Sequence, residues 1–219
     1  MQNDVVSESI STAPSAYMQV VGIVQSLAVG LLLQNAKFFQ LLAEDRINFS
    51  SSDFWLAFIQ ATVAFQLIVL TWHMNLQNVM VFKRAFGMWD SYIPFSFVFA
   101  EYFLILNSTP EKFWQWSFFV FLFTMGGLFA FTHVYIVSRK ELSRNKAVFD
   151  LIGTYPFWVR IYISSMGLIA LAGLLTDAGQ TASRLILAGT IDALIFAFTF
   201  INTRFFWTPI VSAKELRRG

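Results

Sequence analysis

A long apolar stretch at residues 52–82 limits the possible folds of this chain more than any other feature. It contains one acidic residue and no Lys or Arg. About 20 apolar residues are enough for an α-helix to cross a bilayer. The whole chain is 57% hydrophobic and 13% charged, whereas soluble domains have about 25% charged residues. A soluble domain could not bury so much apolar surface, so the sequence predicts an all-α, polytopic integral membrane protein.

Six segments are long enough to span a membrane, and they divide the chain. We predict spans at approximately 16–42, 53–82, 91–107, 111–137, 155–175 and 182–206. The polar, Ser-rich residues 1–14 are expected to form a mobile tail, and residues 208–219 a basic cytoplasmic tail. Residues 15–207 then form one six-helix transmembrane domain. The amphipathic end of the first segment, 35–46, is expected to lie at the membrane interface.

The positions of Lys and Arg predict how these helices are oriented. Lys83 and Arg84 lie between the second and third segments, four cations lie between the fourth and fifth, and three follow the sixth. The loops on the opposite side have fewer cations, mostly beside acids. Cytoplasmic loops of membrane proteins are enriched in Lys and Arg. Both termini are therefore expected in the cytoplasm, and the expected location is the plasma (inner) membrane.

Polar side chains recur along one side of the 52–82 stretch. On a helix with 3.6 residues per turn, four of them fall within an arc of about 60°; these are Thr62, Gln66, His73 and Gln77. Lipid offers such groups no partner, so they must face other helices or water. They either line a hydrated path for an ion or bond to neighbouring helices, including those of a second subunit. Gln25 and Gln60 are further candidates for the path.

Two acids, Glu101 and Asp192, lie near the middle of the third and sixth predicted spans. An ionisable side chain at that depth costs about 2.5–3.5 kcal/mol on insertion scales, so something must offset the cost. A binding site for a cation or a proton would do so. The alternative is a hydrogen bond to a neighbouring Gln or Tyr that holds two helices together.

His73 and His133 are the only histidines. Two histidines on facing helices can bind a haem iron, and imidazole can also sense pH or relay protons. The alternative is a pair of amphipathic interfacial residues, beside Trp72 and Tyr135. No further His or acid stands near either one, so a metal site is not predicted. The sequence predicts no cofactor, and these two histidines are the only candidate haem ligands.

A basic segment follows the fourth predicted span, in an expected loop at residues 138–150. Its cations are Arg139, Lys140, Arg144 and Lys146. They determine topology, or they bind anionic lipid head groups or a soluble cytoplasmic partner. The formal net charge is only +2, which gives no reason to expect nucleic-acid binding.

The sequence contains no phosphate-binding glycine loop, no HExxH, no GxSxG and no Cys, so an enzyme is not the leading prediction. We predict permeation of a small cation or proton through an oligomeric channel or simple transporter, with Glu101 and Asp192 holding the charge. Because so small a chain has little interior, a homo-oligomer or a subunit of a membrane complex is expected. The alternatives are a membrane-embedded effector subunit that docks a soluble partner through its basic loops and, third, a haem or proton-linked membrane enzyme.

Overall fold

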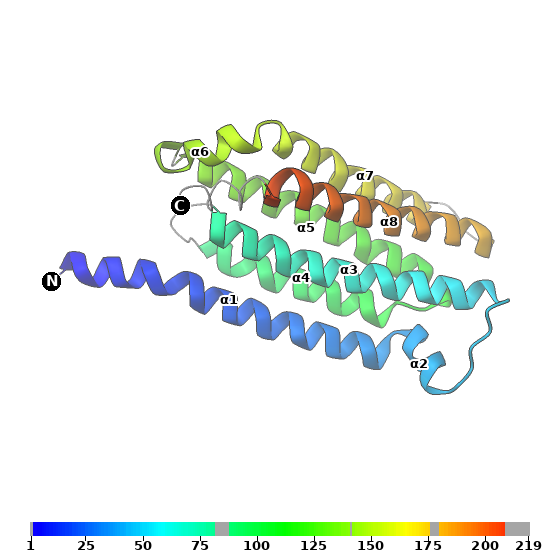
Figure 1. Cartoon of the computed structure of the whole chain (residues 1–219). Helices are drawn as coiled ribbons and strands as arrows, with labels where there is room; N and C mark the ends of the chain where they lie inside the picture. Colours follow the sequence, from blue (N-terminus) through cyan, green and yellow to red (C-terminus); the bar gives the residue numbers. More distant parts are fainter. Residues whose placement is uncertain (1, 82–87, 141, 176–179, 209–219) are drawn as a thin grey trace.

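The computed structural model describes residues 2–81, 88–140, 142–175 and 180–208, and over these residues the chain is helical with no strand (Figure 1). The helices are α1 (Gln2–Asn35), α2 (Lys37–Ala43), α3 (Ser52–Val81), α4 (Met88–Leu106), α5 (Phe113–Lys140), α6 (Leu142–Ile152), α7 (Tyr155–Leu175) and α8 (Thr181–Asn202). A single 3-10 turn (Pro110–Lys112) precedes α5, and a π-helical turn (Thr203–Trp207) follows α8. The all-α prediction is confirmed for this part of the chain.

Five helical segments are long and apolar enough to cross a membrane, which is compatible with a multi-pass membrane protein. They are Tyr17–Asn35, Ser52–Val79, Pro110–Lys140, Tyr155–Leu175 and Thr181–Asn202. The apolar part of α4, Tyr92–Leu106, is shorter, although α4 lies lengthwise beside α3 and α5 (Figure 1). The start of α1 and the end of α8 both point toward the end of the bundle that carries α6, and α2 lies at the opposite end (Figure 1).

The first predicted span differs from the structure at both ends. α1 begins at Gln2, so residues 2–14, where we expected a mobile tail, have helical backbone; extending an existing helix costs less than starting one. α1 also ends at Asn35 rather than near 42, because Ala36 has an extended backbone (φ −68°, ψ 131°). The chain then turns into the short helix α2. The Lys37 amide at its start donates to the Ser108 carbonyl (3.3 Å).

The expected loop at residues 138–150 is also corrected, because most of it is helix. α5 continues to Lys140 and α6 covers Leu142–Ile152. The Asn145 amide is buried and donates to the Ser138 carbonyl (3.0 Å), which ties α6 to the end of α5. Gly153 then has a φ of +48°, a conformation open to glycine, and this allows the sharp turn into α7.

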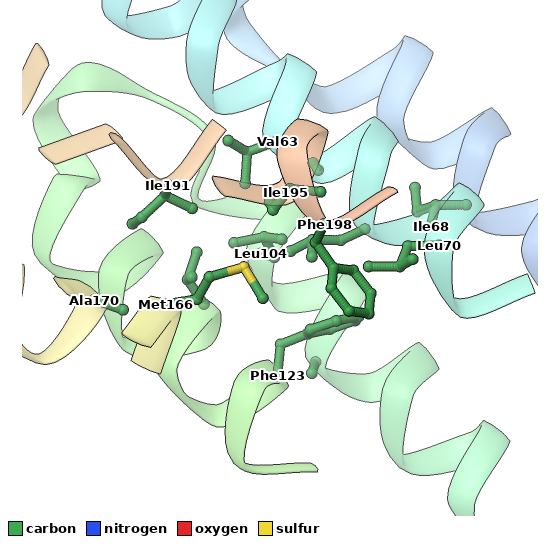
Figure 2. Close-up of a cluster of buried hydrophobic side chains, with 14 of the residues drawn as sticks. Val63, Ile68, Leu70, Leu104, Phe123, Met166, Ala170, Ile191, Ile195 and Phe198 are labelled. Carbon is green, nitrogen blue, oxygen red and sulfur yellow. The ribbon is translucent and has the colours of Figure 1, made fainter. Parts of the chain in front are cut away.

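The core lies where α3, α4, α5, α7 and α8 meet (Figure 2). Figure 2 shows the Phe198 ring between Leu70 on one side and Phe123 on the other, with Met166 close by. α5 and α7 approach closely because α7 has glycines at the contact: a Cβ on Gly173 would lie 2.9 Å from the Ser117 hydroxyl. Small residues allow such close packing in membranes. α3 is central, since it packs on α8 on one side and on α1 and α4 on the other.

Candidate functional site

α3 carries polar side chains on two opposite faces, and this arrangement organises every candidate site residue. One face, toward α8, carries the residues that the sequence singled out, Gln66, His73 and Gln77. The other face, toward α1 and α4, carries Thr71 and Asn75. At 100° per residue the two sets lie roughly 120–180° apart around the helix. The sequence predicted only the first face.

On the first face, the structure brings Gln66 and Asp192 together. The Gln66 amide nitrogen donates to the Asp192 carboxyl at 3.0 Å, which joins α3 to α8. Both residues are half-buried, and the Gln66 carbonyl oxygen is buried with no hydrogen-bond partner among the described residues. Thr62, one turn earlier, donates its hydroxyl to the Phe58 carbonyl (2.9 Å), so its hydrogen bond is made within α3. Of Thr62 and Gln66, only Gln66 therefore contacts an acid.

Further along the same face, four side chains form a hydrogen-bonded network that we call the clamp. Tyr155 of α7 donates its hydroxyl to the Asn202 carbonyl oxygen, the Asn202 amide donates to Gln77 (3.3 Å), and Gln77 contacts the Nε2 atom of His73 (3.0 Å). Tyr155, Gln77 and Asn202 are buried. A carboxamide does not titrate near neutral pH, so two of the four members of the clamp cannot exchange protons. The clamp therefore joins α3, α7 and α8.

On the opposite face of α3, Glu101 of α4 is buried, with 1% of its surface exposed. Neither carboxyl oxygen has a hydrogen-bond partner within the described ranges. The side chains of Thr71 on α3 and Gln25 on α1 approach the carboxyl, but neither contact has the geometry of a hydrogen bond. The Thr71 hydroxyl donates to the Leu67 carbonyl instead (2.8 Å), and the Gln25 carbonyl oxygen also has no hydrogen-bond partner in the described residues. We call Glu101, Thr71 and Gln25 the Glu101 site. It lies where α1, α3 and α4 meet.

A second contact holds α1 beside this site. The Tyr17 hydroxyl donates to the Asn75 carbonyl oxygen at 2.6 Å, and the Asn75 amide donates to the backbone carbonyl of Thr71 at 2.8 Å. Asn75 is buried at the α1–α3 contact. This pair fixes the height of α1 relative to α3, and it therefore also sets the position of Gln25 next to Glu101.

A cavity of about 80 Å³ lies beside the Glu101 site, between α1, α3, α4, α5, α7 and α8. Its polar lining comes from Tyr17, Thr71, Asn75, Asn78, Asp90 and Thr124, and its apolar lining includes Phe97, Phe123 and Phe198. This volume is enough for several water molecules, although most of the lining is apolar and Thr71, Asn75 and Thr124 donate to backbone carbonyls. Thr71 lines the cavity and also lies next to the Glu101 carboxyl.

Other predicted groupings are not brought together. Glu101 and Asp192 lie on opposite faces of α3, and neither forms an ion pair in the described part of the chain. His73 packs against Trp207 with ring centroids 5.7 Å apart, whereas His133 stacks on Phe129 at 6.3 Å. The two imidazoles therefore have different neighbours. Over residues that the structure describes, no three His, Asp or Glu side chains cluster as metal ligands would.

Gln60 is a candidate for the hydrated path, but in the structure it contacts the turn between α4 and α5. It is completely buried, and its amide donates to the carbonyl of Thr109 (3.3 Å) in the turn between α4 and α5. Thr109 is the N-cap residue of the 3-10 turn Pro110–Lys112, and its side chain makes no capping hydrogen bond. At the same end of the bundle Arg184 donates to the Pro110 carbonyl (3.0 Å). Gln60 thus stabilises a turn, away from the acids.

The predicted basic segment lies at the end of the bundle with α6. Arg139 and Lys140 are exposed in the last turn of α5. Lys146 on α6 forms an exposed ion pair with Asp150 (3.0 Å). The side chain of Arg144 lies outside the described residues.

Four residues with a structural part in these sites were missed in the sequence: Thr71, Asn75, Tyr155 and Asn202. A signal existed for three of them. Thr71 and Asn75 lie four residues apart on the 52–82 helix and so share a face of their own. Asn202 is an amide within an apolar span, which is a costly position that needs a partner. Tyr155 begins a span, and nothing in the sequence separates it from an ordinary interfacial tyrosine.

The class of protein that this fold and these sites define is a helical bundle compatible with several membrane passes, with buried polar groups on both sides of a central helix. No protein-family model matches the chain, and no match was found among curated proteins or solved structures. The function must therefore be inferred from the side chains themselves.

Proposed function

We propose that this protein moves protons or small cations across a membrane and that Glu101 is the residue that binds them. The observation that supports the proposal is the state of the carboxyl group: it is almost completely buried, and neither oxygen has a hydrogen-bond partner in the residues described. A buried polar group without a partner is costly, and native structures have few of them. Such a group is expected where a ligand completes it.

A proton or cation bound at this site would provide a partner for both the Glu101 carboxyl and the Gln25 carbonyl oxygen. A carboxylate only accepts hydrogen bonds, and so does the carbonyl oxygen of Gln25. One bound proton gives the carboxyl an O–H donor for that oxygen. A bound cation would instead be coordinated by oxygens of both side chains, which hard cations prefer. In either case the occupant supplies a contact for both side chains.

The cavity supports an access route to the site. Its polar lining follows α3 from Asn78 through Asn75 to Thr71, the residue that interacts with Glu101. Asp90, which is buried in the first turns of α4, also lines it and adds an acidic group to the route. Water in this cavity could deliver a proton or a cation to within one side chain of Glu101. Gln66 and Asp192 are second-rank candidates on the other face of α3.

The proposal is tested by flux into liposomes. Purified protein is reconstituted with a pH-sensitive dye inside, and a potassium gradient with valinomycin drives protons inward; a sodium-sensitive dye tests cations in parallel. We expect Glu101→Gln to reduce the flux to that of empty liposomes. Asp192→Asn is the matched control, since it makes the same carboxyl-to-amide change on the opposite face, and it should keep most of the flux. Equal flux from wild type and from Glu101→Gln rejects the proposal.

We further propose that the protein works as a homo-oligomer with both termini in the cytoplasm and the plasma (inner) membrane around it. The half-buried Gln66–Asp192 pair supports the oligomer, because a carboxyl at mid-span that is partly open to lipid needs further covering. Chemical crosslinking in native membranes tests the oligomer, and labelling of single cysteines introduced at Lys112 and Lys146 tests the orientation. A monomeric protein in membranes would contradict the proposed oligomer, but it would not bear on the proposed role of Glu101.

A membrane-embedded interaction subunit is the second candidate. The exposed cations Arg139, Lys140 and Lys146 at the α6 end support it. It predicts that a soluble protein co-purifies with the chain and is lost when these cations are neutralised, while liposomes show no flux with wild type.

A further inference from the structure

Tyr135, near the end of α5, lies where three helices meet. The guanidinium carbon of Arg160 on α7 lies 5.0 Å from the centre of the tyrosine ring, and that of Arg139 on α5 lies 5.8 Å from it. Phe149 of α6 packs edge-on against the same ring, with centroids 5.5 Å apart. Two arginines from different helices thus lie against one aromatic ring.

Among the residues that the structure describes, no hydrogen bond uses the donors of either guanidinium group. A contact with a ring face uses the charge of an arginine, but none of its five N–H donors. In the ranges that the structure describes, neither Arg139 nor Arg160 forms an ion pair, while Asp150, the acid described on α6, pairs with Lys146. Two like charges held beside one ring repel each other. An anion between them would remove that repulsion.

The position of the two arginines indicates which kind of anion they would bind. Arg139 lies in the last turn of α5, and Arg160 lies in the second turn of α7. Both helices are long and apolar enough to span a membrane, so their ends lie at the depth of the lipid head groups. Arginine binds phosphate through two parallel N–H donors. We propose that Arg139 and Arg160 together bind the phosphate of an anionic phospholipid, with Tyr135 positioning them.

This inference does not depend on the proposed transport. The lipid site uses the ends of α5 and α7, whereas the Glu101 site uses the middle of α1, α3 and α4. A variant that loses lipid binding is therefore expected to keep Glu101-dependent flux in liposomes of neutral lipid. Failure of the transport proposal would leave the lipid measurement unaffected.

The experiment compares lipids on the intact protein in detergent. Phosphatidylglycerol or phosphatidylcholine is titrated in, bound lipid is counted by native mass spectrometry, and thermal unfolding is recorded in parallel. We expect phosphatidylglycerol to be retained and to raise the unfolding temperature, and phosphatidylcholine to do neither. Arg139→Gln with Arg160→Gln should weaken phosphatidylglycerol binding about tenfold or more, since two charged hydrogen-bond donors are lost.

Matched variants separate this site from general surface charge. Lys146→Gln removes a cation from the same end of the bundle and should leave binding unchanged. Tyr135→Leu keeps both charges and should give an intermediate loss, because the arginines are no longer held together. Each single arginine variant is measured as well, so that a misfolded double variant does not decide the result.

Three outcomes would overturn the proposal. The first is equal retention of the two lipids, and the second is unchanged binding by the correctly folded single and double variants. The third is full competition by inorganic phosphate at millimolar concentration, which would identify a site for a soluble phosphate, including that of a soluble partner, instead of a lipid.

Discussion

The clamp and the Glu101 site lie on opposite faces of α3 and are built from similar side chains, but their hydrogen bonds differ. In the clamp, Asn202 receives a hydrogen bond from Tyr155 and gives one to Gln77. In the Glu101 site, both carboxyl oxygens and the Gln25 carbonyl lack hydrogen-bond partners within the described chain. Burial is similar in the two places. The comparison separates a hydrogen-bonded network from a buried carboxyl that has both oxygens without partners. Single buried atoms without partners, such as the Gln60 carbonyl oxygen and the Trp116 indole nitrogen, also occur elsewhere in the described chain, so it is the ionisable group with two such oxygens that distinguishes the Glu101 site.

The largest expected effect is on transport. Glu101→Met should abolish flux, because the group that binds the ion is gone, and it should not lower the free energy of unfolding. Removing an unpartnered carboxyl relieves a burial cost of about 1 kcal/mol or more, and methionine adapts well to irregular space. Flux in liposomes and unfolding in mixed micelles measure the two effects. A large loss of stability would show that Glu101 is a structural residue like those of the clamp.

Asn202→Leu should have the opposite combination of effects. It leaves the Tyr155 hydroxyl and the Gln77 carbonyl oxygen buried without partners, and the free energy of unfolding should fall by about 2–3 kcal/mol. Flux per folded molecule should stay near the wild-type value, because the Glu101 site is on the other face of α3. Both quantities are measured on one preparation. Loss of flux at full stability would contradict the division between the two faces.

Tyr155→Phe tests one end of the clamp with a smaller change. It removes one hydroxyl and leaves the Asn202 carbonyl oxygen without its donor, so we expect a loss of about 1 kcal/mol in unfolding free energy. A double-mutant cycle with Asn202→Leu should show that the two losses are not additive, because both variants remove the same hydrogen bond. Additive losses would mean that the two side chains act independently.

Gln66→Leu should have the smallest effect. Single hydrogen bonds between membrane helices contribute about 0.6 kcal/mol on average, and Asp192 is only half-buried. We expect a loss of about 0.5 kcal/mol in unfolding free energy and little change in flux. Thermal unfolding and the liposome assay are the measurements. A strong decrease in flux would move the transport site from Glu101 to the α3–α8 face.

The sequence predicted the apolar helices well, because hydrocarbon requires long apolar segments and those are visible along a single chain. The α7 bounds agree with the prediction at both ends. The helix α6 was missed, since its charges suggested a loop, whereas the Asn145–Ser138 contact that ties it to α5 depends on the folded chain. The polar arc predicted on the 52–82 helix did include Gln66, which contacts the Asp192 carboxyl. The opposite face of α3 could not be assigned, because one sequence does not say which helices pack against each side.

The placement of α1 has a consequence for how the Glu101 carboxyl is enclosed. Only 22% of the apolar window of α1 is covered by the rest of the protein, against 61% for α3, yet α1 supplies Gln25, one of the walls around that carboxyl. α1 thus shares with α5 the lowest buried fraction among the candidate spans, yet it covers the acid that has the smallest exposed fraction in the described residues. A sideways displacement of α1 that breaks the Tyr17–Asn75 hydrogen bond would expose the Glu101 carboxyl while the other helices of the bundle stay packed, so the covering of this carboxyl depends on a single helix.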